Sequence, residues 1–379
     1  MRIALISASQ VPSRTANSIE VMKVCQAFID LEHEVNLWVP GPQTDVSWDS
    51  LRTFYGLRDR FDIHWMRSAK RLKRYDFCLR SVMSARKWGA DIYYTWPFQA
   101  AAISSRMNLP TLLEVHDRPQ GRFGPRLFGQ YLRGPGAMRI LPITKALLQW
   151  LEEYYSIPTD PGFVVISPSG VDLERYENAP NPTRARKELD LPEKITVGYT
   201  GHLYPGRGLD LMLELARTNP DIQLLWAGGE PAAIERWRTR IQRGGVENLQ
   251  ILGFVPNEQL PLVQAACDIL LLPHERRVSA SSGGDIAAFT SPMKLFEYMA
   301  AGRTILASDL PVLREVLNEK NAAFAPPGSI DSWNAELRSL VRDEGRRNAL
   351  AKQALADAKK YTWVVRAKKS LAGIGTPRG

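Results

Sequence analysis

Several features that define common protein classes are scarce or missing in this sequence. Its 379 residues include three isolated cysteines, so we expect reduced, buried or half-buried thiols and a cytoplasmic location: Cys25, Cys78 and Cys267. No run approaches the ~18 apolar residues that a membrane span requires. The apolar run that opens at Met1 is too short for a cleaved signal peptide, and we expect it to form a buried strand.

Two nucleotide-binding signatures are also missing or incomplete. No Gly-x-Gly-x-x-Gly follows a predicted strand, which removes the main support for a nicotinamide-dependent oxidoreductase. Gly201 and Gly206 have the spacing of a P-loop, but Arg207 and Gly208 stand where an ATPase has lysine and then serine or threonine. The sequence therefore gives little support to an ATPase.

Composition and charge suit a protein of two ordinary domains with an anionic partner. Hydrophobic residues make up 44% and charged residues 23%, close to the average for globular proteins. The formal net charge is +9, and residues 66–139 hold fourteen Lys/Arg against four Asp/Glu, or 14 − 4 = +10. This basic window predicts contact with a membrane surface, a phosphorylated lipid or nucleic acid; the alternative is a solvated helix face.

Short apolar runs alternate with helical patterns along the chain, which is typical of βαβ units with parallel strands. Thirteen strands are expected in two series. The first series has seven, at 1–7, 35–39, 63–66, 92–94, 111–115, 139–141 and 164–166, and the second has six, at 195–199, 222–226, 249–252, 269–272, 304–307 and 322–324. The proline-rich stretch 156–193 indicates an interdomain linker.

These patterns predict an α/β protein with two Rossmann-like, doubly wound domains that face each other across a cleft. We place the N-terminal domain at 1–180 and the C-terminal domain at 181–360. A final helix at about 361–375 should pack back on the first domain. Ligands of such sheets bind beyond the carboxyl ends of the strands.

The stretch 290–302 predicts a helix with both ends marked. Ser291 is a candidate N-cap, Pro292 suits the first helical position, and Gly302 suits the residue past the end. Lys294 lies in the first turn, where the helix dipole disfavours a cation unless an anion binds there. Glu297 lies one turn further, within reach of a hydroxyl group attached to that anion. The alternative is a surface helix with a solvated Lys and Glu.

Two further segments follow predicted strands. Residues 201–210 contain three glycines and a basic residue before a helix at 209–218, which suits a phosphate-binding loop or a plain βα turn. Arg207 is the better phosphate ligand because it is permanently charged and forked. His116 and Asp117 come at the end of an apolar strand. They either face the predicted cleft or have a purely structural role. Asn17 and Ser18 could offer donors at the start of the first helix or merely cap it.

Together these segments resemble the nucleotide-sugar-dependent, retaining glycosyltransferases of family 4, which have the GT-B fold. The resemblance covers nearly the whole chain. It rests on residues 201–210, 252–256 and 291–302, with support from 114–117, 143–147 and 169–173.

The resemblance implies a role for each matching position. Groups of the donor diphosphate site would be Gly201, His202, Arg207, Ser291, Pro292, Met293 and Lys294. Glu297 would hold the ribose hydroxyls, and Phe254, Val255 and Pro256 would lie beside the base. Phe289, Thr290 and Ser291 would lie near the donor sugar, His116 and Asp117 would be catalytic, and Asn17 and Ser18 would belong to the N-terminal loop.

Two departures from the family pattern stand out. The family often has two glutamates separated by seven residues, and the first position here is Phe289, so main-chain groups near Thr290 and Ser291 would have to replace that carboxylate. His202 stands where arginine is common. No two aspartates lie two residues apart, so the metal-binding pair of the other glycosyltransferase fold has no candidate. We expect no cofactor and no metal, with Arg207, Lys294 and helix N-termini offsetting the diphosphate charge.

The resemblance implies a retaining, metal-independent transfer of a hexose from a nucleotide-diphosphate sugar to a glycan or lipid-linked acceptor, in polysaccharide or glycoconjugate biosynthesis. A UDP-sugar is the favoured donor and GDP-mannose is possible. We expect a cytoplasmic protein that can contact the inner face of an anionic membrane through 66–139. The alternatives are a GT-B sugar-nucleotide epimerase or hydrolase and a basic nucleic-acid-binding protein, although no nucleic-acid-binding signature is present.

Overall fold

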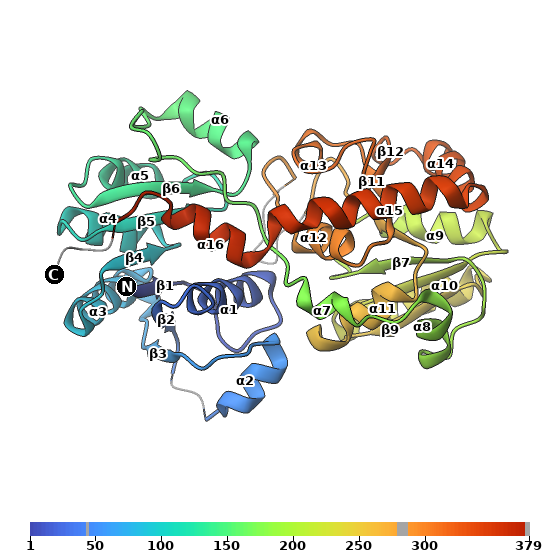
Figure 1. The fold of residues 1–379 in the computed structure, drawn as a ribbon, viewed down its shortest axis with the longest axis horizontal. Coiled ribbons are helices and arrows are strands. Elements are labelled where there is room, and N and C mark those ends of the chain that lie inside the picture. Colours follow the sequence, from blue (N-terminus) through green and yellow to red (C-terminus); the bar gives the residue numbers. More distant parts are fainter. Residues whose placement is uncertain (43–44, 279–286, 376–379) are drawn as a thin grey trace. The chain divides into compact units, whose positions relative to one another are not determined.

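The computed structural model describes residues 1–42, 45–278 and 287–375. Contacts divide the chain into two units: unit 1 comprises residues 1–169 and the C-terminal segment from Trp363, and unit 2 comprises residues 170–362. Each unit contains one six-stranded sheet flanked by helices, and all described strand pairs are parallel (Figure 1). The predicted pair of doubly wound sheets is confirmed, and the predicted cleft between them stays a prediction.

Unit 1 has the strand order β3-β2-β1-β4-β5-β6. Its strands are β1 (Arg2–Ile6), β2 (Glu34–Pro40), β3 (Asp62–Met66), β4 (Ile92–Thr95), β5 (Thr111–Val115) and β6 (Ala137–Pro142). Its helices are α1 (Ala16–Ile29), α2 (Trp48–Tyr55), α3 (Tyr75–Trp88), α4 (Phe98–Arg106), α5 (Gly124–Leu132), α6 (Lys145–Tyr154) and α16 (Trp363–Leu371).

Unit 2 repeats this topology with the order β12-β11-β10-β7-β8-β9. Its strands are β7 (Thr196–Thr200), β8 (Gln223–Ala227), β9 (Leu249–Gly253), β10 (Ile269–Leu272), β11 (Thr304–Ser308) and β12 (Ala323–Ala325). Its helices are α7 (Glu174–Glu177), α8 (Pro182–Glu188), α9 (Leu209–Thr218), α10 (Pro231–Arg243), α11 (Leu260–Ala265), α12 (Met293–Ala300), α13 (Pro311–Arg314), α14 (Ile330–Arg342) and α15 (Glu344–Ala358).

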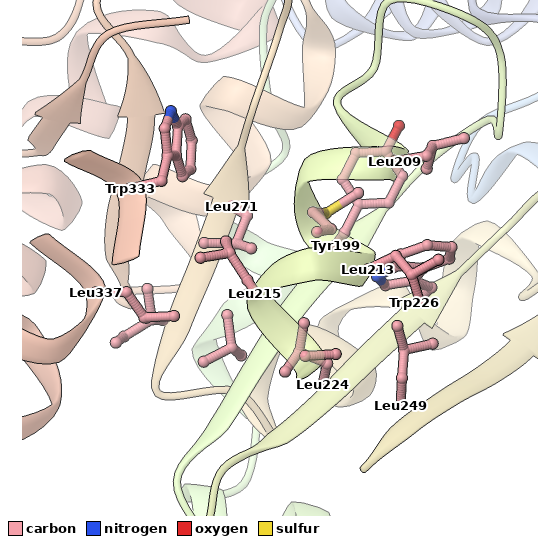
Figure 2. Close-up of a cluster of buried hydrophobic side chains, with 14 of the residues drawn as sticks. Tyr199, Leu209, Leu213, Leu215, Leu224, Trp226, Leu249, Leu271, Trp333 and Leu337 are labelled. Carbon is pink, nitrogen blue, oxygen red and sulfur yellow. The ribbon is translucent and has the colours of Figure 1, made fainter. Parts of the chain in front are cut away.

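The sheet of unit 2 is buried on both faces, as parallel sheets usually are. Side chains alternate between the faces along each strand, so Trp226 joins one core cluster while Leu225 and Ala227 join the other. Figure 2 shows the first cluster, in which Trp226 from β8 and Leu213 from α9 pack with other strand and helix side chains. The two packed faces hold the carboxyl edge of the sheet in place.

Two segments differ from the sequence prediction. The expected strand at 164–166 forms only an isolated bridge from Val164 to Ile140. The expected linker 156–193 contains α7 and α8, and Tyr176, Ala185 and Leu191 are buried in the second core cluster of unit 2. Residues 170–180 therefore belong to unit 2, and the predicted boundary at 180 is corrected to one after Ser169. The prolines suggested a linker, but burial of apolar side chains of this stretch in the core of unit 2 makes its second half part of that unit.

The C-terminal helix α16 belongs to unit 1, where Arg139 of β6 binds its last turn. The buried guanidinium donates to the carbonyl oxygens of Ser370 at 2.6 Å and Ala372 at 2.7 Å, and to that of Gly162 at 2.5 Å. A cation at this end of a helix also opposes the dipole favourably. No helix within the described residues combines the length and the apolar character needed to cross a membrane.

We predict that Arg139→Met lowers the free energy of unfolding by about 3 kcal/mol, because buried carbonyl groups lose charged hydrogen-bond donors. Urea denaturation measures this change. Arg338→Met is the matched control, since it removes a pair with the exposed Asp221 and should cost less than about 1 kcal/mol. Equal, small losses in both variants would show that Arg139 does not hold the helix.

Candidate functional site

Two loops of unit 2 meet where its strand order reverses. β7 and β10 are neighbours in the sheet, and the loops that follow them begin at Gly201 and Pro273. A side chain at Gly206 would come within 2.1 Å of the carbonyl oxygen of Arg277, so the loops pack backbone against backbone. The amide of Glu275 donates to the carbonyl of Gly206 at 3.0 Å. This reversal point at the carboxyl edge is where open α/β sheets bind ligands.

Lys294 reaches this edge from the first turn of α12. Its Nζ atom is buried, has no hydrogen-bond partner within the described residues, and lies 3.9 Å from the centre of the Tyr199 ring. A β-carbon at Gly201, where φ is +137°, would lie 2.4 Å from that nitrogen. Glycine is therefore required at 201 both by the backbone and by the approach of the lysine.

Arg207 lies beside a histidine that the sequence analysis did not single out. Its Nη1 atom is 2.9 Å from Nε2 of His274, which is fully buried. Because a guanidinium can only donate, Nε2 of His274 must accept, and the ring is neutral with its proton on Nδ1. Burial lowers the pKa of His274 well below 6.5, and Arg207 and Lys294 lower it further. His274 can thus hold Arg207 without adding positive charge.

The positive charge of this cluster is not compensated by an ion pair. Neither Arg207 nor Lys294 forms a salt bridge within the part of the chain that the structure describes. Burial lowers the pKa of Lys294 well below 10.5, Arg207 lowers it further, and Glu297, one turn along α12, partly opposes the shift. A bound anion would supply the missing charge. The arrangement can hold a phosphate or diphosphate group.

The start of α12 differs from the sequence prediction in one detail. The N-cap is Pro292 rather than Ser291, and Pro292 makes no side-chain cap hydrogen bond. The amide of Leu295 donates to the carbonyl of Pro292 at 2.9 Å. Met293 is the first helical residue, and Gly302 has the predicted left-handed conformation with φ +59°. The positive end of the helix dipole would favour a phosphate-sized anion here in addition to Lys294.

The other residues predicted to contact the sugar donor lie after β7, just before α12 and after β9. His202 stacks on Tyr204 with ring centres 4.7 Å apart. Phe289 and Thr290 are buried just before α12. Phe254, Val255 and Pro256 follow β9, and Phe254 is 42% exposed. Their loop is anchored by Arg175, which donates to Asn257 at 3.0 Å.

Unit 1 places its candidate residues at the ends of β5 and in α1. His116 follows β5 and hydrogen-bonds through Nε2 to Glu114. Asp117 accepts from the amide of Arg118 at 2.7 Å and from the side chain of Gln120, so it also shapes its own loop.

Neither predicted residue in α1 caps that helix, whose N-cap is Thr15. Ser18 is buried and its hydroxyl lies 2.6 Å from that of Tyr55, while Asn17 is exposed in the first turn.

One group in the described chain has metal-ligand spacing. Ligand atoms of Glu20, Glu114 and His116 lie within 4.8 Å of one another. Arg366, however, lies 2.6 Å from Glu114 and 3.7 Å from Glu20, and its guanidinium supplies the positive charge that a metal would bring. These residues therefore do not fit a metal as they stand.

Sequence reasoning missed three residues for different reasons. His274 follows the strand adjacent to β7, so a topological argument could have found it. Glu20 lies inside a helix, and Arg366 lies more than 200 residues from the two carboxylates that it contacts, so no local pattern marks either one.

The comparisons with known proteins agree with this architecture. Residues 182–357 match the model of the family described as glycosyl transferases group 1. The chain is 27% identical over 259 residues to the D-inositol 3-phosphate glycosyltransferase of Segniliparus rotundus, covering 65% of this chain and 54% of that protein. It is 27% identical over 191 residues to the GDP-mannose-dependent alpha-(1-6)-phosphatidylinositol monomannoside mannosyltransferase of Mycolicibacterium smegmatis, covering 48% of each. The chain thus spans about half the length of these curated relatives.

A solved structure resembles the whole chain. Anabaena HepE in complex with UDP-glucose has a TM-score of 0.74 at 17% identity, covering 98% of both chains. The fold is therefore GT-B. The match of residues 182–357 to the glycosyl transferases group 1 family supports the predicted assignment to the GT-B glycosyltransferases of family 4.

We predict that Lys294→Met raises the free energy of unfolding of the ligand-free protein by about 1 kcal/mol. The variant removes a buried, unpaired charge, which outweighs the loss of a cation–π contact of about 0.5–2 kcal/mol. Since the folded-state pKa of Lys294 is lowered, the stability of the parent protein should rise with pH toward 10.5, and the variant should lack this rise.

Thermal and urea unfolding measure both effects. Lys320→Met, at an exposed lysine, is the control and should change the stability by less than about 0.5 kcal/mol. Pyrophosphate should stabilise the parent protein more than Lys294→Met. A marked loss of stability in Lys294→Met would contradict the idea that its charge is uncompensated.

Proposed function

We propose that the protein is a retaining glycosyltransferase that moves a hexose from a nucleotide-diphosphate sugar to a glycan or lipid-linked acceptor. The observation that carries the proposal is the pair of partly buried, uncompensated cations, Arg207 and Lys294, at the carboxyl edge of the unit 2 sheet. A diphosphate brings the charge that this pair lacks, and the match of residues 182–357 to the glycosyl transferases group 1 family supports a sugar nucleotide as its carrier.

The donor would lie along the carboxyl edge of unit 2. Arg207, Lys294 and the first amides of α12 would bind the diphosphate, with Gly201 leaving room for the lysine. Glu297 would hold the ribose hydroxyls, and the loop 254–256 would lie beside the base. The family often has a glutamate at the position of Phe289. Main-chain groups at Thr290 and Ser291 would contact the sugar in place of that carboxylate.

A UDP-sugar is the favoured donor, and GDP-mannose is the second candidate. The solved structure of HepE holds UDP-glucose, and one curated relative is named as GDP-mannose-dependent. The acceptor belongs to polysaccharide or glycoconjugate biosynthesis in this proposal.

Retention would follow from attack on the same face of the sugar that the phosphate leaves. The acceptor oxygen forms a bond to the anomeric carbon as the bond from that carbon to the phosphate oxygen breaks. The electron pair stays on the phosphate oxygen, which takes the acceptor proton. Arg207 and Lys294 stabilise the negative charge that develops on the leaving diphosphate, so no metal is needed. His116 would act at the reacting centre, with Asp117 beside it.

We predict that Arg207→Ala and Glu297→Ala each lower kcat/KM by roughly 100-fold or more while the protein stays folded. The assay measures nucleotide release from UDP-, GDP- and ADP-sugars with and without acceptor, in the presence of EDTA, and NMR of the product gives the anomeric configuration. Arg217→Ala and Glu214→Ala are controls, because they remove an exposed ion pair on α9.

Near-parental rates in both site variants would show that Arg207 does not bind the diphosphate and that Glu297 does not hold the ribose. Release that needs no acceptor would favour a hydrolase or epimerase. Loss of activity with EDTA would overturn metal independence, and an inverted product would overturn retention.

An exposed surface of unit 1 suits a lipid-linked acceptor. Tyr75, Leu79 and Met83 lie at helical spacing on α3, and their side chains are 37%, 48% and 46% exposed. Leu72, just before α3, is 53% exposed. We call these four residues the α3 stripe. Exposed cations flank it: Arg71, Lys73, Arg74, Arg80, Arg86 and Lys87. An apolar stripe between cations fits the interface of an anionic bilayer, where each cation contributes about 1 kcal/mol.

We predict that the protein sediments with phosphatidylglycerol vesicles at low salt and less with phosphatidylcholine vesicles. Leu79→Glu with Met83→Glu should abolish sedimentation, because it places charge on the apolar stripe. Leu355→Glu is the matched control, since Leu355 is 42% exposed on α15 of unit 2. No binding of the parent protein at low salt would end the membrane proposal, and equal binding to RNA would favour a general polyanion surface.

A further inference from the structure

His116 is held by charged groups on both of its ring nitrogens. Nε2 hydrogen-bonds to Glu114, and Nδ1 lies 3.9 Å from a carboxylate oxygen of Glu20 on α1. The ring is 29% exposed, whereas both carboxylates are almost fully buried. Each ring nitrogen of His116 therefore has a carboxylate oxygen within 4 Å. Two carboxylates next to one imidazole ring favour its protonated form over the neutral one.

Arg366 forms an ion pair with Glu114 and so offsets the free-energy cost of burying this carboxylate. Its guanidinium lies 2.6 Å from Glu114, and Tyr94 donates to the other oxygen of the same carboxylate. Arg366 also donates to the carbonyl of Pro168 at 2.9 Å. Burial raises the pKa of Glu114, but Arg366 and then His116 outweigh it and lower this pKa to about 2. Glu114 is therefore a fixed anion paired with a fixed cation.

Glu20 completes the set of charges around the ring. It lies 3.7 Å from Arg366 and accepts from the hydroxyl of Ser169 at 3.4 Å. Burial raises the pKa of Glu20, and His116 opposes that shift. Burial also lowers the pKa of His116, but Glu20 and Glu114 outweigh it and the net shift is upward. Arg366 offsets the charge of Glu114, and the His116 ring is 29% exposed against 6% for Glu20, so water stabilises a positive charge on the ring.

We propose that Glu20, Glu114 and Arg366 are positioning residues that hold His116 in one orientation with both ring nitrogens protonated, so that His116 serves the reaction as a fixed cation and not as a general base. The inference rests on the proposed function, because it assigns a state to a residue placed there at the reacting centre. It makes the C-terminal helix α16, through Arg366, a supporting element of the reaction in unit 1. The acceptor proton then goes to the departing phosphate.

NMR titration of the histidine side chains tests the protonation state without any substrate. The chain has five histidines, and the signal of His116 is assigned from its loss in His116→Gln. His116 should stay protonated above pH 6.5, and Glu20→Gln and Glu114→Gln should each lower its pKa by about one unit or more, since each removes an anion beside the ring. Titration at or below pH 6.5, or no change in either variant, would overturn the proposal.

The pH dependence of kcat tests whether the cation serves turnover. The alkaline limb should follow the pKa measured by NMR and shift to lower pH in Glu20→Gln, while the KM of the donor stays unchanged because its site is in unit 2. Glu114→Gln should lower kcat roughly 100-fold. An activity that rises as His116 loses its proton would instead identify a general base.

Two further variants separate positioning from stability. Glu114→Gln leaves Arg366 without its partner and can destabilise the fold, so Glu114→Gln with Arg366→Met removes both charges together. The double variant should regain stability without regaining turnover; recovery of turnover would show a purely structural role. Asp268→Asn, which breaks the buried pair with Arg186 in unit 2, should lower stability without moving the pH profile. If no sugar nucleotide is turned over, the proposed function fails while the NMR result still stands.

Discussion

Two partly buried cations without a counterion dominate the chemistry of unit 2. Arg207 and Lys294 repel each other where burial of their charged groups weakens screening by water, and the surrounding residues reduce that cost without cancelling the charge. The Tyr199 ring faces the ammonium group, and the neutral His274 accepts from the guanidinium. The free protein therefore carries an electrostatic cost that an anion relieves on binding. Binding sites often retain such locally unfavourable groups at the expense of stability.

The two units share one topology but differ in whether their buried charges are paired. At the edge of the unit 2 sheet, Arg207 and Lys294 have no salt-bridge partner among the described residues, which suits a site that must attract and then release a diphosphate. Behind His116 in unit 1 the charges are paired, with Arg366 against Glu114 and Glu20 beside the ring. A paired network holds a side chain in place but offers little attraction to a free ion. The first arrangement suits binding and the second suits orientation.

Sequence patterns predicted the parts of the site that depend on local structure. The glycine-rich turn after β7 and the helix carrying Lys294 were found because strands, turns and helix starts have short-range signals. The N-cap at Ser291 was wrong because α12 begins one residue later, after Pro292. The linker at 156–193 was misjudged because prolines there coexist with apolar side chains that the core of unit 2 buries. His274 and Arg366 depend on which strands and helices become neighbours, and a single sequence does not show that.

The central claim is that the charge of Arg207 and Lys294 exists to hold a diphosphate. A crystal structure of the protein with UDP tests this most directly. The account predicts both phosphates within hydrogen-bond distance of Arg207, Lys294 and the first amides of α12, with the ribose at Glu297. A diphosphate bound elsewhere, with these two cations still unpaired, would contradict it.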